Sequence, residues 1–177
     1  MRTLMAFLLG AWLLGMILVA FVAAENFFEV DRLLASPPST EYRAEFQKRL
    51  APLAPGDARM ALRYLSSELN RFYFRVWGGT ELMLGAALLV LAIKSRMDRR
   101  FRAGVWVMLA LSVLMTVYLT PQLVEIGRAL DFASRDTPPP QLGRFGMLHG
   151  AYSALDLLKL LVGIWLTVRL VRAPVQT

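Results

Sequence analysis

The chain contains no cysteine among its 177 residues and only one histidine. Without cysteine it cannot form disulfides, thiolate-bound metal sites, iron–sulfur clusters or the thioether links of c-type haem. The sequence also lacks a nucleophile–base pair, a phosphate-binding glycine loop and a metal-ligand spacing of the recognised kinds. We therefore expect a protein that is not an enzyme.

Acidic residues are fewer than basic ones, with 13 Asp and Glu against 20 Lys and Arg and a formal net charge of +7. In a soluble protein this excess would indicate nucleic acid as a partner. Here the basic residues gather at the ends of apolar blocks, where anionic lipid head groups and membrane topology account for them. We expect the lipid bilayer as the partner, and no nucleic acid.

Apolar residues are abundant, at 56% of the chain, against about 45–50% in typical soluble domains. They are concentrated in four blocks, at residues 4–24, 72–93, 103–120 and 145–168. Each block is roughly long enough to cross a hydrocarbon core of about 30 Å, where backbone groups must be satisfied within a helix. The first block is longer than the apolar region of a signal peptide, so we expect it to be a transmembrane helix. The sequence predicts an all-α fold, an integral membrane four-helix bundle.

We expect a single membrane domain over residues 1–177, with a partly helical outer segment at 25–71. Within that segment, residues 40–50 are expected to form a short helix. The third membrane helix is expected to end at Pro121, because proline cannot continue the helical hydrogen bonds. The predicted membrane helices cover residues 3–24, 72–95 with an extension back to about 58, 102–120 and 142–172.

Basic residues also predict the orientation, because cytoplasmic loops of membrane proteins carry an excess of Lys and Arg. Segments 25–71 and 121–144 are balanced, with seven basic and seven acidic residues in the first and three of each in the second. We expect a bacterial inner membrane, with these two segments outside and both termini in the cytoplasm. The basic residues on the cytoplasmic side are Arg2, Lys94, Arg96, Arg99, Arg100, Arg102, Arg169 and Arg172.

Polar residues share one side of the predicted fourth helix. At about 100° per residue, His149, Tyr152, Asp156 and Lys159 fall within an arc of roughly 80°. Beside this arc, small residues recur every four positions and form a ridge on which another helix can pack closely. We expect both the arc and the ridge to turn inward. The ridge consists of Gly146, Gly150 and Ala154.

Glu81 in the second apolar block lies at the same expected depth as Asp156. Glu81 is 13 residues from Lys94, and Asp156 is 13 residues from Arg169, which places both roughly 20 Å from the inner anchors at about 1.5 Å per residue. Thr116 of the third helix lies near the same level. The expected intramembrane polar cluster consists of Glu81, Asp156, Lys159, Thr116 and Tyr152.

Three roles for this cluster follow from the chemistry of its residues. An ionisable side chain inside a membrane costs about 2.5–3.5 kcal/mol on insertion scales and marks a functional site by default, here a ligand or proton site. Polar contacts between membrane helices also fix helix register, which would make the cluster structural. The third role is a contact with another subunit.

His149 is the single histidine, and it lies near the outer interface. It could ligate haem or the magnesium of chlorophyll, although a haem iron would need a second chain or a methionine for its other axial position. Methionine thioethers suit Cu(I), yet methionines in an apolar chain more often serve packing. We predict no cofactor, and we keep haem or chlorophyll at His149 as the alternative to a hydrogen-bonded histidine at the membrane edge.

Two stretches, LTPQLVEIGRAL and GRFGMLHGAYSALDLLKLLVG, resemble the C-terminal half of a family of small bacterial four-helix membrane proteins. This is the transmembrane-protein-205-like domain family of unknown function, which is distantly similar to copper-resistance D membrane domains. The resemblance rests on Thr120-Pro121 closing the third helix and Leu148-His149-Gly150 opening the fourth. Asp156 departs from the pattern, since an uncharged polar residue such as asparagine is expected there. The resemblance implies fold and topology, and no mechanism.

The sequence favours a non-enzymatic membrane protein that serves as an accessory or interaction subunit of a membrane complex. The first alternative is a small transporter or metal-handling protein that uses the Glu81, Asp156 and Lys159 cluster. The second is a haem- or chlorophyll-bearing subunit with His149 as the axial ligand.

Overall fold

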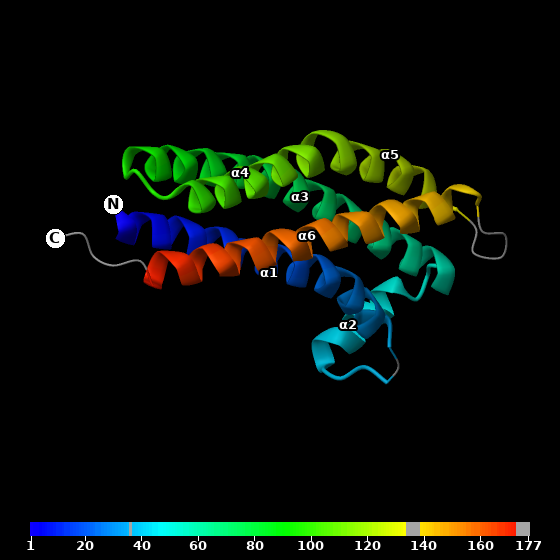
Figure 1. Ribbon diagram of the computed structural model, residues 1–177. Coiled ribbons are helices and arrows are strands. Elements are labelled where there is room, and N and C mark those ends of the chain that lie inside the picture. Colours follow the sequence, from blue (N-terminus) through cyan, green and yellow to red (C-terminus); the bar gives the residue numbers. More distant parts are fainter. Residues whose placement is uncertain (36, 134–138, 173–177) are drawn as a thin grey trace.

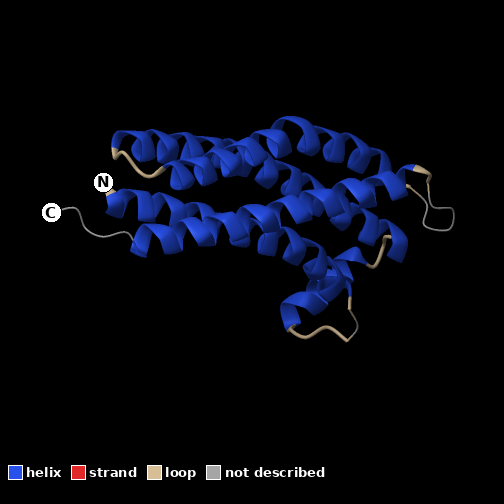
Figure 2. Ribbon diagram, viewed as in Figure 1, coloured by secondary structure: helices blue, strands red, loops and turns tan. Residues whose placement is uncertain are grey.

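The computed structural model describes residues 1–35, 37–133 and 139–172, and every regular element within these ranges is helical. Four long rods lie side by side and form an elongated bundle (Figures 1 and 2). The rods are α1, α3, the continuous run α4–η1–α5, and α6. The elements are α1 (Arg2–Leu34), α2 (Glu41–Leu50), α3 (Pro55–Lys94), α4 (Arg99–Leu114), the π-helical turn η1 (Met115–Leu119), α5 (Thr120–Leu130) and α6 (Gln141–Arg172).

Neighbouring rods along the chain run antiparallel, so that particular segments gather at each end of the bundle (Figure 1). The N-terminus, the turn between α3 and α4, and the last turns of α6 lie at one end, which we call the basic end. The opposite, distal end carries α2, the start of α3, α5 and the start of α6. Chain segments far apart in sequence therefore meet at both ends.

The helices mostly follow the prediction from the sequence. The short helix predicted at 40–50 corresponds to α2, and the long helix predicted from about 58 corresponds to α3. The fourth predicted helix, 142–172, corresponds to α6. The first helix, whose membrane part is predicted at 3–24, continues into the partly helical outer segment and ends at Leu34, so α1 extends well beyond its apolar block.

Asp98 accounts for the sharp turn at the basic end. Its carboxylate accepts hydrogen bonds from the backbone N–H groups of Arg100 and Phe101 at 2.9 and 3.0 Å, as an N-cap residue does. The same carboxylate accepts a hydrogen bond from Arg169 of α6 at 3.1 Å. Asp98 therefore starts α4 and ties it to the last turns of α6.

The prediction that the third membrane helix ends at Pro121 is wrong. The helix continues from α4 through η1 into α5 and ends at Leu130. Proline has no backbone N–H, and its ring crowds the carbonyl four residues earlier, here that of Val117. A π turn, with its i→i+5 hydrogen bonds, accommodates one extra residue. η1 ends at Leu119, two residues before Pro121, and the chain passes the proline without leaving the helix.

Glycines bring the four rods into close contact on the basic side of the bundle. A Cβ atom at Gly85 of α3 would lie only 2.8 Å from Leu109 and from Trp12, and one at Gly104 of α4 would lie 2.8 Å from Trp165. A Cβ at Gly163 of α6 would overlap Leu13 of α1. The fully buried side chains around these contacts are Met5, Leu9, Trp12, Leu88, Phe101, Val105, Met108 and Leu166.

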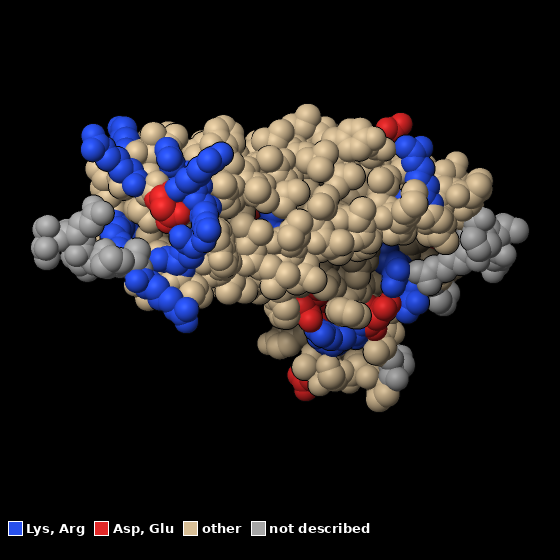
Figure 3. All heavy atoms as spheres, viewed as in Figure 1, with Lys and Arg blue, Asp and Glu red and all other residues tan. Residues whose placement is uncertain are grey.

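The outside of the bundle is apolar between its two ends. Three of the described helical stretches are long and apolar enough to cross a membrane, namely Arg2–Leu34, Gly56–Lys94 and Arg99–Leu130. Large apolar side chains are exposed on them, as at Phe7, which is 70% exposed. Figure 3 shows a middle band almost free of charge, with Lys and Arg gathered at the basic end and both signs of charge at the distal end.

Candidate functional site

A buried ion cluster joins α3 and α6 in the middle of the bundle. The Lys159 ammonium of α6 lies 2.7 and 2.8 Å from the two carboxylate oxygens of Glu81 on α3. It also lies 3.0 Å from an oxygen of Asp156, one turn earlier on α6. The side chains of Lys159 and Glu81 are 0% and 2% exposed, while that of Asp156 is 25% exposed. The structure therefore brings together the three ionisable residues that the sequence assigned to one polar cluster.

Trp12 of α1 adds a contact that sequence reasoning missed. Its indole N–H donates a hydrogen bond of 3.0 Å to Glu81, and the side chain is fully buried. Indole N–H is a donor only, so it stabilises the charged carboxylate. The sequence did contain a signal for this contact. Tryptophan in membrane helices is enriched at the two interfaces, whereas Trp12 lies ten residues from the start of α1, in the interior of the span, where its N–H needs an acceptor. The cluster thus connects three of the four rods.

The hydrogen bonds of the Lys159 ammonium are saturated. An ammonium has three N–H donors, and three carboxylate oxygens from Glu81 and Asp156 lie within 2.7–3.0 Å of it. Two carboxylates against one ammonium leave one negative charge, which the Trp12 N–H partly offsets. Because a buried charge is stable only when paired and hydrogen-bonded, the arrangement is suited to locking the three rods in register.

The two hydroxyl residues predicted for the cluster lie beside it and make other contacts. Thr116 packs against the backbone of Gly78, where a Cβ would lie 2.8 Å from its hydroxyl oxygen. The Tyr152 ring meets Phe74 edge-on, with ring centroids 5.7 Å apart, and its hydroxyl is hydrogen-bonded to the side chain of Thr120. Tyr152, Phe74 and Thr120 also line the cavity described next.

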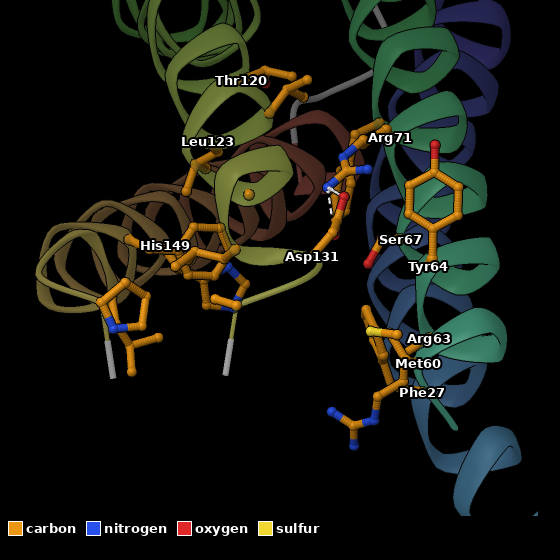
Figure 4. A pocket seen from close by; sticks show the side chains of 18 of the residues that line it. Phe27, Met60, Arg63, Tyr64, Ser67, Arg71, Thr120, Leu123, Asp131 and His149 are labelled. Atoms are coloured by element: carbon orange, nitrogen blue, oxygen red, sulfur yellow. Dashed lines mark hydrogen bonds and ion pairs between the residues drawn. The ribbon is translucent and has the colours of Figure 1, made fainter. Parts of the chain in front are cut away.

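A cavity of about 720 Å³ opens at the distal end, between α3 on one side and α5 and α6 on the other. Figure 4 shows the two sides facing each other, with Tyr64 and Met60 opposite Leu123 and His149. Its volume is within the range of about 300–1,000 Å³ typical of small-molecule sites. Apolar side chains dominate its walls: Met60, Phe74, Leu123, Val124, Leu142 and Phe145.

An ion pair crosses the wall of this cavity and joins α3 to the end of α5. The Arg71 guanidinium donates to both carboxylate oxygens of Asp131, at 2.9 and 2.8 Å, and also to Glu68 at 2.7 Å. The side chains of Arg71 and Asp131 are only 9% and 6% exposed. Two carboxylates satisfy this guanidinium, so it holds the cavity together and has little capacity for a further anion.

Two further arginines line the cavity nearer the start of α3. Arg59 and Arg63 both pair with Asp31 of α1, at 3.0 and 3.5 Å. The Arg63 guanidinium lies over the ring of Phe27, 5.9 Å from its centroid. Its Nε is buried and has no hydrogen-bond partner among the described residues. This end of the cavity therefore carries cationic groups that its own neighbours do not fully satisfy.

His149 lies in the wall of the cavity, on α6. Its ring stacks on Phe145, with centroids 6.0 Å apart and an angle of 9° between the planes. In the described part of the chain, no group of three or more His, Asp or Glu residues is arranged to hold a metal ion. His149 is thus placed to contact a molecule in the cavity from one side.

The expectation that the small-residue ridge of α6 turns inward is wrong. Gly146, Gly150 and Ala154 are exposed, and a Cβ at either glycine would meet open space. The polar arc and the ridge are adjacent on the helix, and the pairing of Lys159 with Glu81 decides which of them faces the bundle. The glycine that α6 uses for close packing is Gly163 instead.

Comparisons of the chain with protein-family models, with curated proteins and with solved structures found no match.

Proposed function

We propose that the chain is a four-span integral protein of a bacterial inner membrane, with both termini in the cytoplasm. The apolar middle band and the three helices of sufficient length support membrane insertion. α6 is 32 residues long, and Lys159, its buried mid-helix cation, is paired with Glu81 and with Asp156 of the same helix, so α6 can serve as the fourth span. The excess of Lys and Arg at the basic end supports the orientation.

We propose further that the protein is a non-enzymatic accessory component that holds a molecule at the outer face of the membrane. The observation that carries this proposal is the position of the distal cavity. A hydrocarbon core of about 30 Å corresponds to about 20 helical residues. Counted outward from Lys94 and Arg169, that length reaches Phe74 and His149, which both line the cavity. The cavity therefore stands on the outer surface of the bilayer.

The ion cluster supports a holding role over conduction. Lys159 and Glu81 are buried and saturated, so they close the interior of the bundle below the cavity. The observation that favours the alternative, a small transporter or metal-handling protein, is the 25% exposure of Asp156. Uptake of protons or metal ions into proteoliposomes, measured for the wild type and for Asp156→Asn, tests this alternative. A transporter requires uptake by the wild type and a changed uptake by the variant.

Two interpretations of the sequence stay predictions under this proposal. Membership of the transmembrane-protein-205-like family rests on the motifs at Thr120-Pro121 and Leu148-His149-Gly150. Haem or chlorophyll ligation rests on His149, whose place in the cavity wall suits an axial ligand. An absorbance spectrum of protein purified from its native membrane tests the second, since a Soret or Qy band that is lost in His149→Ala would support it.

The absence of cysteine makes topology simple to test. Single cysteines are introduced at Ser39, before α2, and at Arg99, at the start of α4. In intact cells permeabilised only at the outer membrane, a membrane-impermeant maleimide should label Ser39→Cys and not Arg99→Cys. Labelling of both variants after full lysis is the control. The reverse pattern would contradict the proposed orientation.

The holding role is tested by filling the cavity. Ser67 of α3 lines it, and the structure gives its hydroxyl no hydrogen-bond partner within the described residues. Native mass spectrometry after gentle extraction should show a bound molecule or partner on the wild type and its loss in Ser67→Trp. The matched control is Leu65→Trp, which changes an exposed residue of the same helix outside the cavity. A wild type that is always a bare monomer would refute the holding role.

A further inference from the structure

The shape of the distal cavity limits what it can hold. It extends along α3 from Gly56 to Phe74, which corresponds to about 27 Å at about 1.5 Å per residue. An acyl chain of one lipid leaflet spans half of a core of about 30 Å, so one extended chain and its head group fit within this length. The apolar walls, with Met60 and Leu123 on opposite sides, match such a chain.

The charges of the cavity are uneven along its length. Near Phe74, Arg71 is neutralised by Asp131 and Glu68. Near Gly56, two guanidinium groups, those of Arg59 and Arg63, share the single carboxylate of Asp31. Two positive charges and one negative charge leave an excess of one positive charge in this group of three residues.

A hydrogen-bond donor accompanies this unbalanced charge. The Nε of Arg63 is buried and lacks an acceptor in the described part of the chain. A buried donor without an acceptor costs about 1–3 kcal/mol, and a movement of the Arg63 side chain that brings this donor to a carboxylate or phosphate oxygen would relieve that cost through a charge-assisted bond. Charge and hydrogen bonding thus both favour an anion at the same end of the apolar cavity.

We infer that the cavity binds a single-chain amphiphile with one anionic head group, of which a long-chain fatty acid is the simplest. The head group lies at Arg59 and Arg63, and the chain runs along the apolar walls toward Phe74 and the bilayer surface. This inference rests on the proposed holding role and names the molecule held. The single unbalanced positive charge matches a single negative charge on the ligand.

The test measures binding of palmitate to the full-length protein in detergent micelles of an uncharged glycoside, with hexadecanol as the uncharged ligand of equal chain length. The wild type should bind palmitate at least ten-fold more tightly than hexadecanol, because each charge-assisted hydrogen bond contributes about a factor of ten. Arg59→Gln/Arg63→Gln should lose this preference and leave hexadecanol binding unchanged. Arg75→Gln, an exposed position on the same helix, should behave like the wild type.

A second variant tests the sign of the charge effect without removing a cation. Asp31→Asn removes the carboxylate that Arg59 and Arg63 share, so palmitate affinity should rise while hexadecanol affinity stays the same. An unchanged or lower palmitate affinity would count against a head group at these arginines. This variant also guards against misfolding, since a damaged protein would lose binding of both ligands.

The outcomes separate this inference from the holding role. Equal affinity for palmitate and hexadecanol, abolished by Ser67→Trp, would overturn the anionic head group and leave the cavity as a binding site. Tighter binding of phosphatidylglycerol, a two-chain lipid, than of palmitate would overturn the single-chain assignment. Binding of neither ligand would overturn the inference, while a different molecule found on the wild type and lost in Ser67→Trp would still uphold the holding role.

Discussion

The two halves of the bundle are built from the same helices and pack in opposite ways. Toward the basic end, Gly85, Gly104 and Gly163 each touch a neighbouring rod so closely that a side chain has no room. Toward the distal end, Gly143, Gly146 and Gly150 face open space, and the rods diverge around a cavity of about 720 Å³. Glycine content therefore does not by itself indicate close helix packing; a glycine packs closely only where a neighbouring rod is held against it.

Ion pairs show the same contrast. In the middle of the bundle, the ammonium of Lys159 has as many carboxylate oxygens around it as it has N–H groups. In the distal cavity Arg71 is satisfied in the same way by two carboxylates, whereas Arg59 and Arg63, nearer the start of α3, share one carboxylate. A saturated cluster serves to fix geometry, whereas an unsaturated one retains affinity for an incoming anion.

The largest expected effect comes from breaking the buried cluster. Lys159→Met leaves the Glu81 carboxylate buried without its ammonium, and loss of one partner of a buried ion pair costs about 3–5 kcal/mol. We expect a clear fall in the thermal unfolding midpoint of the protein in detergent. The double variant Lys159→Met/Glu81→Gln should recover much of the loss, because it removes the buried carboxylate together with the ammonium and leaves only Asp156, whose side chain is 25% exposed. A single variant as stable as the wild type would show that the cluster does not hold the rods together.

Filling a glycine contact should have a smaller effect that depends on the half of the bundle. Gly85→Leu forces a side chain against Leu109 and Trp12, and overpacking of this kind costs typically about 1–3 kcal/mol. Gly150→Leu places the same side chain in open space and should leave the unfolding free energy unchanged or raise it by up to about 1 kcal/mol, because leucine is the better helix former. Urea or thermal unfolding of both variants measures the difference. Equal losses of unfolding free energy in Gly85→Leu and Gly150→Leu would show that the two halves of the bundle do not differ in packing.

The smallest expected effect concerns Asp98 and its dependence on pH. Loss of an N-cap side chain costs about 1 kcal/mol, so Asp98→Ala should be slightly less stable than the wild type at pH 7. Hydrogen bonding from the backbone N–H of Phe101, assisted by Arg169, holds the pKa of Asp98 below its usual range.

A lowered pKa fixes the sign of the pH effect. The unfolded chain takes up the proton first, so the contribution of Asp98 is fully present above the ordinary carboxyl pKa of about 3.9. It is lost as the pH falls through the lowered value. The stability difference between wild type and Asp98→Ala should thus be constant from pH 7 to 5 and shrink below pH 4. A difference that grows on acidification would contradict this assignment.

Much of the helical fold could be predicted from the sequence, because an apolar run of membrane length leaves the backbone little choice but helix. The pairing of Glu81 with Lys159 was also predictable, since charges at one depth in apolar surroundings must meet. The contribution of Trp12 was harder to foresee, because an indole counts as apolar in a hydropathy pattern while its N–H acts as a polar group.

Features that depend on three-dimensional placement were missed or predicted wrongly. The ridge at Gly146 and the polar face of α6 are neighbours on the helix, and only the partner on α3 decides which one faces inward. The cavity depends on α5 continuing beyond Pro121, which a rule for proline in regular helices does not allow. Its closing contact, between Arg71 and Asp131, joins residues 60 positions apart, and no local pattern connects them.

The π-helical turn η1 acts as a fixed rotation within one rod. One inserted residue turns everything after it by about 100° around the helix axis. The faces of α4 and α5 are thereby decoupled, and Leu123, Gly127 and Asp131 point into the cavity because of that offset. Deleting one residue of 115–119 would restore a regular helix and turn Leu123, Gly127 and Asp131 away from the cavity, with α4 left in place. The width and lining of the distal site can therefore be changed by chain length alone, without altering any residue that lines it.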